Sequence, residues 1–237
     1  MDLKKLTIKE FDKAAKHFED NTPSVYNLCK KDYPDILAEI NKENWHSVLD
    51  AGCGTGAVLE LLSKKYPDKE YTGIDISEKM IEVANRKNLP NTRFVQGDCE
   101  NLPFENESFD TVICSQSFHH YTDPQAFFNS VSRVLKNGGR LILRDMSTNI
   151  MPVYWFVNHK QALLRETLRV LKKGSTFAIH DLMSPIRYGN MQKFVSELKK
   201  EGYEKVELID TTNNMFMSRR EAIRLQLGSS TLLIGKK

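Results

Sequence analysis

The segment Val48–Gly56, "VLDAGCGTG", decides the fold expected of this chain. A short apolar run ends in a carboxylate, Asp50, and three glycines follow at alternate positions. This order predicts a buried strand, a tight turn and the N-terminus of a helix. Gly52, Gly54 and Gly56 leave the turn without Cβ atoms, so a ligand can lie against its backbone amides.

The glycine spacing alone leaves two classes of ligand open. Gly-Cys-Gly-Thr-Gly-Ala also fits the dinucleotide fingerprint, in which a pyrophosphate lies on the helix N-terminus. A fixed carboxylate at Asp50 would repel a pyrophosphate and attract the ammonium of an amino acid. Asp50 therefore favours an amino acid ligand, and a nicotinamide dehydrogenase remains as an alternative that rests on the glycine spacing only.

The rest of the chain indicates an α/β fold with a doubly wound sheet, because short apolar runs alternate with amphipathic segments of helix length. The expected strands are His46–Ala51, Glu70–Ile74, Thr92–Gln96, Phe109–Ser115, Gly139–Asp145, Lys205–Asp210 and Thr231–Lys236. The expected helices are Ala57–Lys65, Ser77–Lys87, Asp123–Leu135 and Met191–Lys200.

Two further carboxylates follow the next two strands. Asp75 ends the second strand in "YTGIDIS", where a carboxylate can accept from both hydroxyls of a ribose. Asp98 follows the third strand in "VQGDCENLPF", where a short acid can accept from the exocyclic amine of adenine. Together with Asp50, these positions describe a site for an adenosine joined to an amino acid.

Five motifs in order resemble the class I S-adenosylmethionine-dependent methyltransferases, in the small-molecule branch similar to the enzymes of ubiquinone and menaquinone biosynthesis. They are "VLDAGCGTG", "GIDIS" followed by "EKM", "GDCENLPF", "FDTVICSQSFHHY" and "VLKNGGRLILRD". The resemblance covers residues 45–145 closely. It implies a Rossmann-like seven-stranded sheet in the order 3-2-1-4-5-7-6, with the last strand antiparallel, and S-adenosyl-L-methionine as cofactor.

The resemblance also implies a set of cofactor-binding residues, which it carries over position by position. They are Phe18, Asp50, Gly52, Gly54, Gly56, Asp75, Ile76, Met80, Asp98, Cys99, Ser115 and Gln116. In this assignment Asp50 and the three glycines line the methionine part and Asp75 holds the ribose. Phe18 covers the cofactor at a position where the family has tyrosine.

The remaining members of that set lie around the adenine and the sulfonium. Ile76 and Met80 would flank the adenine ring, although core packing is an equally good role for Met80. The backbone of Cys99 would read the adenine edge beside Asp98. Ser115 and Gln116, after the fourth strand, would lie beneath the sulfonium and the substrate.

Candidate catalytic residues cluster directly after the fourth strand, as His119, His120 and Tyr121. Methyl transfer from a sulfonium is an in-line displacement, so alignment supplies much of the rate. A general base is needed only when the nucleophile must lose a proton. The alternative is that the histidines shape the pocket or bond to backbone, because adjacent side chains in a turn cannot both point at one atom.

The acceptor is expected to be a small molecule, with oxygen or carbon methylation ahead of nitrogen or sulfur. The fourth-strand motif lacks the Asp/Asn-Pro-Pro-Tyr sequence of many amide and adenine N-methyltransferases, and no RNA-binding module is recognisable. The alternative hypothesis is a catalytically silent S-adenosylmethionine-binding sensor or assembly protein.

The domain organisation expected is a single methyltransferase domain over 1–237. The residue pattern of 1–45 is typical of helices and predicts an N-terminal helical cap. Residues 146–190 are too many for a strand-to-helix connection, so they predict a lid insertion after the fifth strand, where substrate specificity is expected to lie.

Composition restricts partners and location. Thirty-four basic residues face 31 acidic ones, for a net charge of +3, which is too small an excess to predict a nucleic acid partner. No segment predicts a signal peptide or a membrane span, so a cytoplasmic location is expected. The four cysteines form no C-x-x-C pair, so neither a metal site nor a disulfide framework is expected. We expect a monomer or a homodimer.

Overall fold

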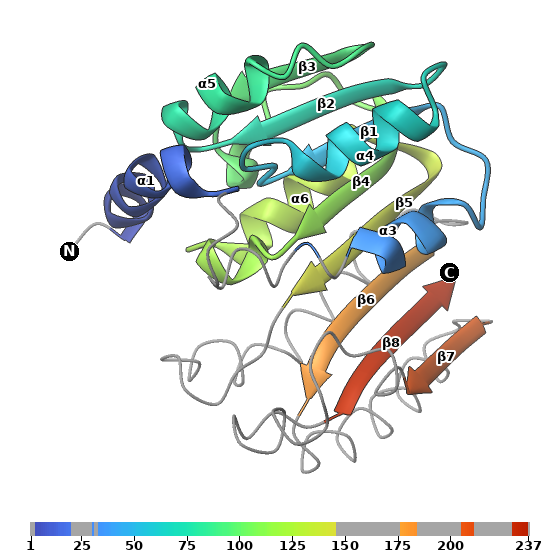
Figure 1. Cartoon of the computed structure of the whole chain (residues 1–237). Helices are drawn as coiled ribbons and strands as arrows, with labels where there is room; N and C mark the ends of the chain where they lie inside the picture. The colour runs from blue at the N-terminus through green and yellow to red at the C-terminus, as the bar shows by residue number, and fades with distance from the viewer. Residues whose placement is uncertain are drawn as a thin grey trace.

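The computed structural model describes residues 3–19, 30, 33–145, 176–183, 205–210 and 229–236. Eight strands form one sheet in the order β3-β2-β1-β4-β5-β6-β8-β7 (Figure 1). The strands are β1 (Ser47–Ala51), β2 (Glu70–Asp75), β3 (Thr92–Gln96), β4 (Phe109–Ser115), β5 (Leu135–Asp145), β6 (Thr176–Met183), β7 (Lys205–Asp210) and β8 (Ser229–Lys236). The described α-helices are α1 (Leu3–Ala14), α3 (Tyr33–Ile40), α4 (Ala57–Lys65), α5 (Glu78–Asn85) and α6 (Pro124–Val134). Short 3₁₀ turns are η1 (Ala15–His17), η3 (Cys99–Asn101) and η4 (Phe118–His120).

The first five strands are parallel and have the order 3-2-1-4-5 that the resemblance implies. In this order β1 and β4 are neighbours. The strand that follows β1 lies on one side of this pair, and the strand that follows β4 lies on the other side. Ligands of such sheets bind outside the carboxyl ends of the strands at this switch point. The glycine turn that follows β1 therefore lies at the place where a ligand is expected.

Among the described residues the sheet has eight strands, whereas the resemblance implies seven. The additional strand, β6, is parallel to β5 and antiparallel to β8, and β8 is antiparallel to β7 as well. Its sequence, "TFAIHDLM", has the β-branched and aromatic content of a strand, but this segment is not among the seven expected strands. Thus 176–183 of the expected lid 146–190 is a strand of the sheet. The rest of that segment and the expected helix Met191–Lys200 lie outside the described residues.

Two element boundaries differ from those expected. Helix α6 ends at Val134, and β5 begins at Leu135, which pairs with Phe109 before the register shifts. Gly138 takes a left-handed φ of 76°, so the Asn-Gly-Gly sequence bends the strand. Helix α5 begins after Ser77, whose Oγ accepts from the Met80 amide at 3.2 Å.

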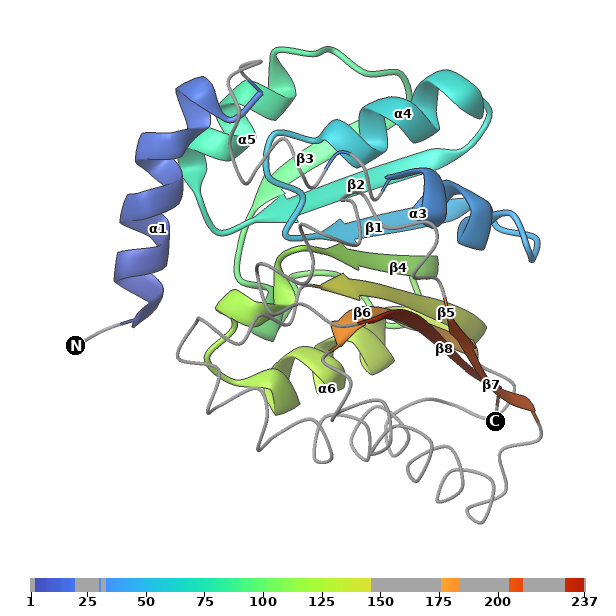
Figure 2. The ribbon, with the colours of Figure 1, turned by 60° about the horizontal axis from the view of Figure 1, so that its bottom comes forward.

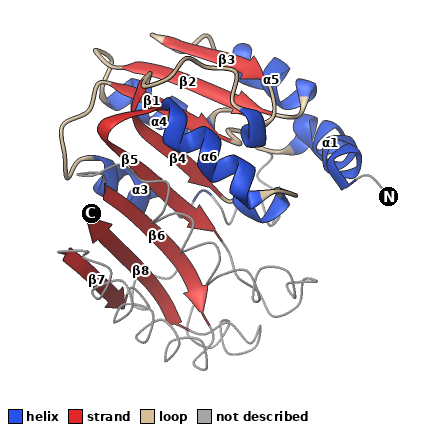
Figure 3. Ribbon diagram, turned by 180° about the vertical axis from the view of Figure 1, so that it is seen from behind, coloured by secondary structure: helices blue, strands red, loops and turns tan. Residues whose placement is uncertain are grey.

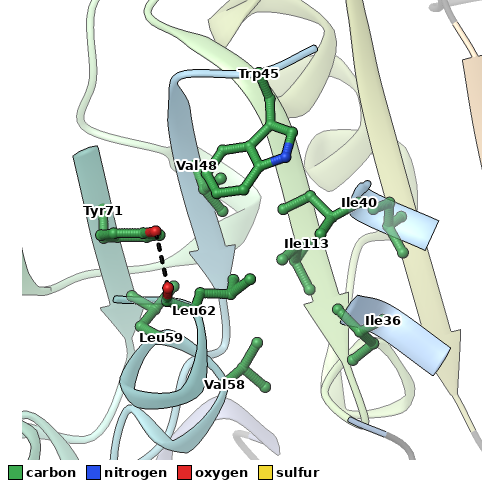
Figure 4. Close-up of a cluster of buried hydrophobic side chains, with 10 residues drawn as sticks. Ile36, Ile40, Trp45, Val48, Val58, Leu59, Leu62, Tyr71 and Ile113 are labelled. Carbon is green, nitrogen blue, oxygen red and sulfur yellow. Dashed lines mark hydrogen bonds between the residues drawn. The ribbon is translucent and has the colours of Figure 1, made fainter. Parts of the chain in front are cut away.

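Helices cover both faces of the sheet. Helices α3, α4 and α5 lie on one face and α6 lies on the other (Figures 2 and 3). The first face packs a cluster that includes Ile36, Leu59 and Ile113, and the Tyr71 hydroxyl donates to the Leu62 carbonyl at 3.1 Å (Figure 4). Both faces are thus buried, which explains why the central strands lack polar alternation. None of the described helices is long and apolar enough to cross a membrane.

Candidate functional site

A pocket lies at the carboxyl edge of the sheet, and most of the predicted site residues line it. Those on its wall are Phe18, Asp50, Gly52, Gly54, Asp75, Ile76, Asp98, Cys99, Ser115, Gln116, His120 and Tyr121. Gly56 and Met80 are not among the lining residues, and the side chain of His119 lies outside the described part of the structure. The pocket therefore brings together predicted residues from four separate strands and the N-terminal segment.

The backbone conformation of the glycine turn favours glycine at positions 52 and 54, which line the pocket, so no side chain projects into it from these two positions. Gly52 and Gly54 have φ values of 78° and 53°, which L side chains rarely adopt. A Cβ on Gly52 would lie 1.8 Å from the Ser117 Oγ, so only glycine fits there. A Cβ on Gly54 would lie 3.7 Å from the ring of Phe18, which closes the pocket over the turn.

Gly56 and Met80 do not line the pocket, and packing explains both residues. Gly56 precedes α4 with a left-handed φ of 77°, and a Cβ there would lie 2.6 Å from the ring of Phe94. A side chain at position 56 would therefore clash with Phe94 of β3, so packing explains why a glycine stands here. Met80 is fully buried in α5, which agrees with core packing.

Asp50 places a buried carboxylate oxygen without a hydrogen-bond partner at the pocket wall. It is 1% exposed, and its Oδ2 has no hydrogen-bond partner among the described residues. Burial raises the pKa of Asp50 to about 7, and the charge of Asp75 adds to the increase. A buried carboxylate without a partner is costly, and a cationic ligand would remove that cost.

Asp75 is held in place by backbone amides. Its Oδ2 accepts from Gly54 N and its Oδ1 from Ser77 N, both at 2.9 Å. Burial raises the pKa of Asp75, and these two amide bonds oppose the increase. The carboxylate thereby joins the glycine turn to the start of α5, and each oxygen keeps a lone pair for a ligand.

The end of β4 has an unusual backbone. Gln116 has a left-handed φ of 52°, and its amide donates to the Arg144 carbonyl of β5 at 2.7 Å. A non-glycine residue in this conformation is uncommon and is often found at functional sites. The chain turns sharply here and presents Ser115, Gln116 and Ser117 to the pocket.

The catalytic candidates differ in their hydrogen bonds, burial and ring contacts. The Tyr121 hydroxyl donates to the Ala51 carbonyl at 3.3 Å and accepts from the Ser117 Oγ at 3.1 Å. Burial raises the pKa of Tyr121 well above its usual value, so this phenol is a poor base. His120 lines the pocket, and its ring meets that of Phe11 edge-on at 4.9 Å.

Glu100 fastens the turn that carries His120 and Tyr121. It is 8% exposed, and its Oε1 accepts from the Thr122 amide at 2.6 Å and the Asp123 amide at 3.1 Å. Glu100 directly follows the Asp98–Cys99 pair in the chain. It therefore connects the turn after β3 with the turn after β4.

The N-terminal segment 3–19 contacts the turns after β1, β2 and β3, and α1 lies beside α5 (Figures 1 and 2). Lys4 Nζ is 2.7 Å from Asp98 Oδ2, and the Asp12 Oδ1 accepts from the Ser77 Oγ at 2.6 Å. The Thr55 hydroxyl, inside the glycine turn, donates to Glu19. Polar contacts thus attach this segment to the turns after β1, β2 and β3.

Sequence reasoning missed several residues of the pocket wall. They are Lys4, Thr7, Phe11, Tyr33, Cys53, Val58, Glu100 and Ser117. Cys53, Glu100 and Ser117 stand next to residues that were predicted, so adjacency was an available signal. No sequence pattern indicates which side of α1 meets the pocket, because that contact depends on how the helix docks.

Comparison with known proteins supports these motifs over the central segment. Residues 49–143 match the family model described as a methyltransferase domain. The demethylmenaquinone methyltransferase of Thermotoga maritima is 38% identical over 117 residues, which cover 49% of this chain and 49% of that protein. A phthiotriol/phenolphthiotriol dimycocerosates methyltransferase of Mycobacterium leprae is 35% identical over 159 residues, which cover 63% and 58%. The matches thus span about half the length of these relatives.

Solved structures extend the likeness of fold to the whole chain. The geranyl diphosphate C-methyltransferase of Streptomyces coelicolor superposes with a TM-score of 0.59 at 12% identity, covering 100% of this chain and 98% of that one. At this identity the likeness concerns the fold alone. Over residues 49–143 the chain is therefore similar to methyltransferase domains, and the five ordered motifs lie in or next to this segment.

Proposed function

We propose that the chain binds S-adenosyl-L-methionine in this pocket and transfers its methyl group to a small-molecule acceptor. The observation that carries the proposal is the buried, unpartnered Oδ2 of Asp50 beside a glycine turn whose left-handed backbone disfavours side chains at Gly52 and Gly54. An α-ammonium supplies the missing positive charge, and the turn has no side chain at Gly52 or Gly54 that would block the rest of an amino acid. A pyrophosphate would add negative charge next to Asp50 and Asp75.

The remaining contacts of the cofactor follow from where each strand ends. Asp75 keeps lone pairs for ribose hydroxyls, and Asp98 offers a carboxylate oxygen to the adenine amine. Ile76 and the backbone of Cys99 would border the adenine. Phe18 would cover the ligand through its ring, since it has no hydroxyl to donate.

Bound S-adenosylmethionine supplies a methyl group on an electrophilic sulfonium. The chain's own contribution is to align an acceptor with that group and to exclude water. Ser115 and Gln116 lie where they can border the sulfonium side of the pocket. His120 is the best candidate to take a proton from an acceptor, because Tyr121 is held as a buried neutral phenol.

The acceptor class that we propose is a small metabolite methylated at oxygen or carbon. Two relatives are named for methylation of small molecules, which supports this class. A histidine at the pocket wall suits an acidic hydroxyl or an activated carbon, each of which must lose a proton on methylation. We infer that residues 146–190 contribute to acceptor selection.

Titration calorimetry with S-adenosylmethionine tests the proposal. Wild-type protein and His120→Ala should bind, while Asp75→Ala should lose binding. Asp68→Ala is the matched control, because Asp68 is an exposed carboxylate far from the pocket wall, and it should bind like wild type. Normal binding by Asp75→Ala would refute the site.

Transfer is tested with methyl-labelled S-adenosylmethionine and a metabolite extract. Wild-type protein should place label in a small molecule, and His120→Ala should place much less at equal cofactor saturation. Binding without any labelled product would instead favour a sensor or assembly role for the protein. Equal labelling by wild type and His120→Ala would remove His120 as the base.

A further inference from the structure

Helix α1 delivers a charged side chain to the adenine end of the pocket. Lys4 Nζ lies 2.7 Å from Asp98 Oδ2 and 2.5 Å from Glu100 Oε2. Burial lowers the pKa of Lys4, but hydrogen bonds to the two carboxylates outweigh it and raise the value overall. The pocket wall therefore includes a fixed ammonium that the sequence did not predict.

The position of this ammonium conflicts with the role of Asp98. The Oδ1 of Asp98 accepts from the Glu100 amide at 2.9 Å, so Oδ2 is the oxygen that faces Lys4. An adenine amine that approaches from the pocket needs the same carboxylate. Two donors thus meet at one acceptor, and both groups of the ion pair are only about one-third exposed.

We propose that Lys4 is a specificity-determining residue whose ammonium competes with the purine 6-amino group for Asp98. This inference rests on the proposed function, in which Asp98 accepts from the adenine. Glu100 gives Lys4 a second carboxylate, so the lysine stays paired when an adenine takes Asp98. The competition costs affinity for a 6-aminopurine and provides a donor for a 6-oxopurine.

The two purines should therefore respond in opposite directions to loss of the ammonium. A 6-amino group donates, so it gains when Asp98 becomes available. A 6-oxo group accepts, so it loses its donor and faces a bare carboxylate. A change that merely loosened α1 would move both affinities the same way.

The test uses Lys4→Met, which keeps an unbranched apolar stem and removes the charge. Wild type and variant are titrated with S-adenosylhomocysteine and with S-inosylhomocysteine. We expect S-adenosylhomocysteine to bind Lys4→Met roughly two- to five-fold tighter, the size of a partly exposed ion pair. S-inosylhomocysteine should bind it more weakly than it binds wild type.

Two control variants separate this effect from loosening of the helix. Lys13→Met removes an exposed lysine of α1 that pairs only with Glu10 among the described contacts, and should change neither affinity. Asp12→Ala removes the contact to Ser77 while leaving Lys4 in place, and should weaken both ligands alike or leave both unchanged.

The inference is overturned if Lys4→Met shifts both ligands in the same direction or shifts neither. Failure of the proposed function has a different signature, because wild type would then bind neither nucleoside. Thermal unfolding of Lys4→Met within a few degrees of wild type shows that the comparison concerns folded protein.

Discussion

A buried carboxylate whose oxygen lacks a partner is stable only if it is protonated or if a ligand supplies a charge. Asp50 is such a group, and its pKa of about 7 lies far above the value of 3.8 for an exposed aspartate. Desolvation is the larger cause, and the neighbouring Asp75 is the smaller one. Asp50 therefore lowers the free energy of unfolding of the empty protein and raises its affinity for a cationic ligand.

Cofactor affinity should depend on the protonation of Asp50. Only the carboxylate attracts an ammonium, so the association constant for S-adenosylmethionine should fall about tenfold for each pH unit below pH 7. Calorimetry between about pH 6 and pH 8 measures this slope. Asp50→Asn should bind weakly with no such dependence, and a flat wild-type profile would contradict the assignment.

Stability of the empty protein should show the opposite sign. The folded pKa of Asp50 exceeds the unfolded value, so the folded state binds more protons between about pH 4 and pH 7, and the free energy of unfolding falls as pH rises through that range. Asp50→Asn should therefore be more stable than wild type at pH 8, by up to about 4 kcal/mol. Denaturant titrations at pH 4 and pH 8 measure it, and a difference that does not grow with pH would refute the prediction.

Gly52 and Gly138 allow a matched comparison of two left-handed glycines. Their φ values are 78° and 76°, but a Cβ would clash with Ser117 at Gly52 and meet nothing within 4 Å at Gly138. Gly138→Ala should cost about 1 kcal/mol from its backbone conformation alone. Gly52→Ala should cost about 3 kcal/mol or more, and also lose cofactor binding. Equal losses of unfolding free energy would mean that the close approach to Ser117 is wrong.

At the scale of elements, Glu100 couples two turns that carry different parts of the site. The turn after β3 holds Asp98, and the turn after β4 holds His120 and Tyr121, with Glu100 bonded to the amides of Thr122 and Asp123. These turns lie on neighbouring parts of the pocket but belong to different loops. The Glu100 carboxylate therefore helps to fix their relative position.

Glu100→Gln tests the coupling. The amide keeps one acceptor oxygen but loses the charge that strengthens its bonds to backbone amides and to Lys4, so unfolding free energy should fall by about 1–3 kcal/mol. Hydrogen exchange of Thr122 and Asp123 should accelerate. Glu105→Gln, at an exposed position, is the control and should change neither quantity. Unchanged exchange at Thr122 would contradict the role of Glu100.

At the scale of the whole molecule, the sequence predicts the central sheet and most of the pocket for one physical reason. Parallel strands place their carboxyl ends at a common edge, so residues such as Asp50, Asp75 and Asp98 converge although they are far apart in the chain. The period of apolar residues locates the strand ends, and the resemblance to the class I methyltransferases supplies the strand order and most of the pocket residues.

The features that the sequence did not predict depend on docking between distant segments. Lys4 and Asp98 are separated by 94 positions, and no local pattern pairs them. Strand β6 joins the sheet because the edge of β5 accepts another strand, which is a property of the assembled sheet. The roles of Gly56 and Met80 likewise depend on their neighbours in space, Phe94 and the buried side of α5.

The measurement that tests the central claim most directly is competition between S-adenosylhomocysteine and NAD for the pocket. Wild-type protein is titrated with S-adenosylhomocysteine at pH 8, alone and in the presence of excess NAD, and Asp75→Ala is titrated alongside. We expect saturable binding at one site per chain, no displacement by NAD and no binding by Asp75→Ala. Displacement by NAD, or equal binding by Asp75→Ala, would contradict it.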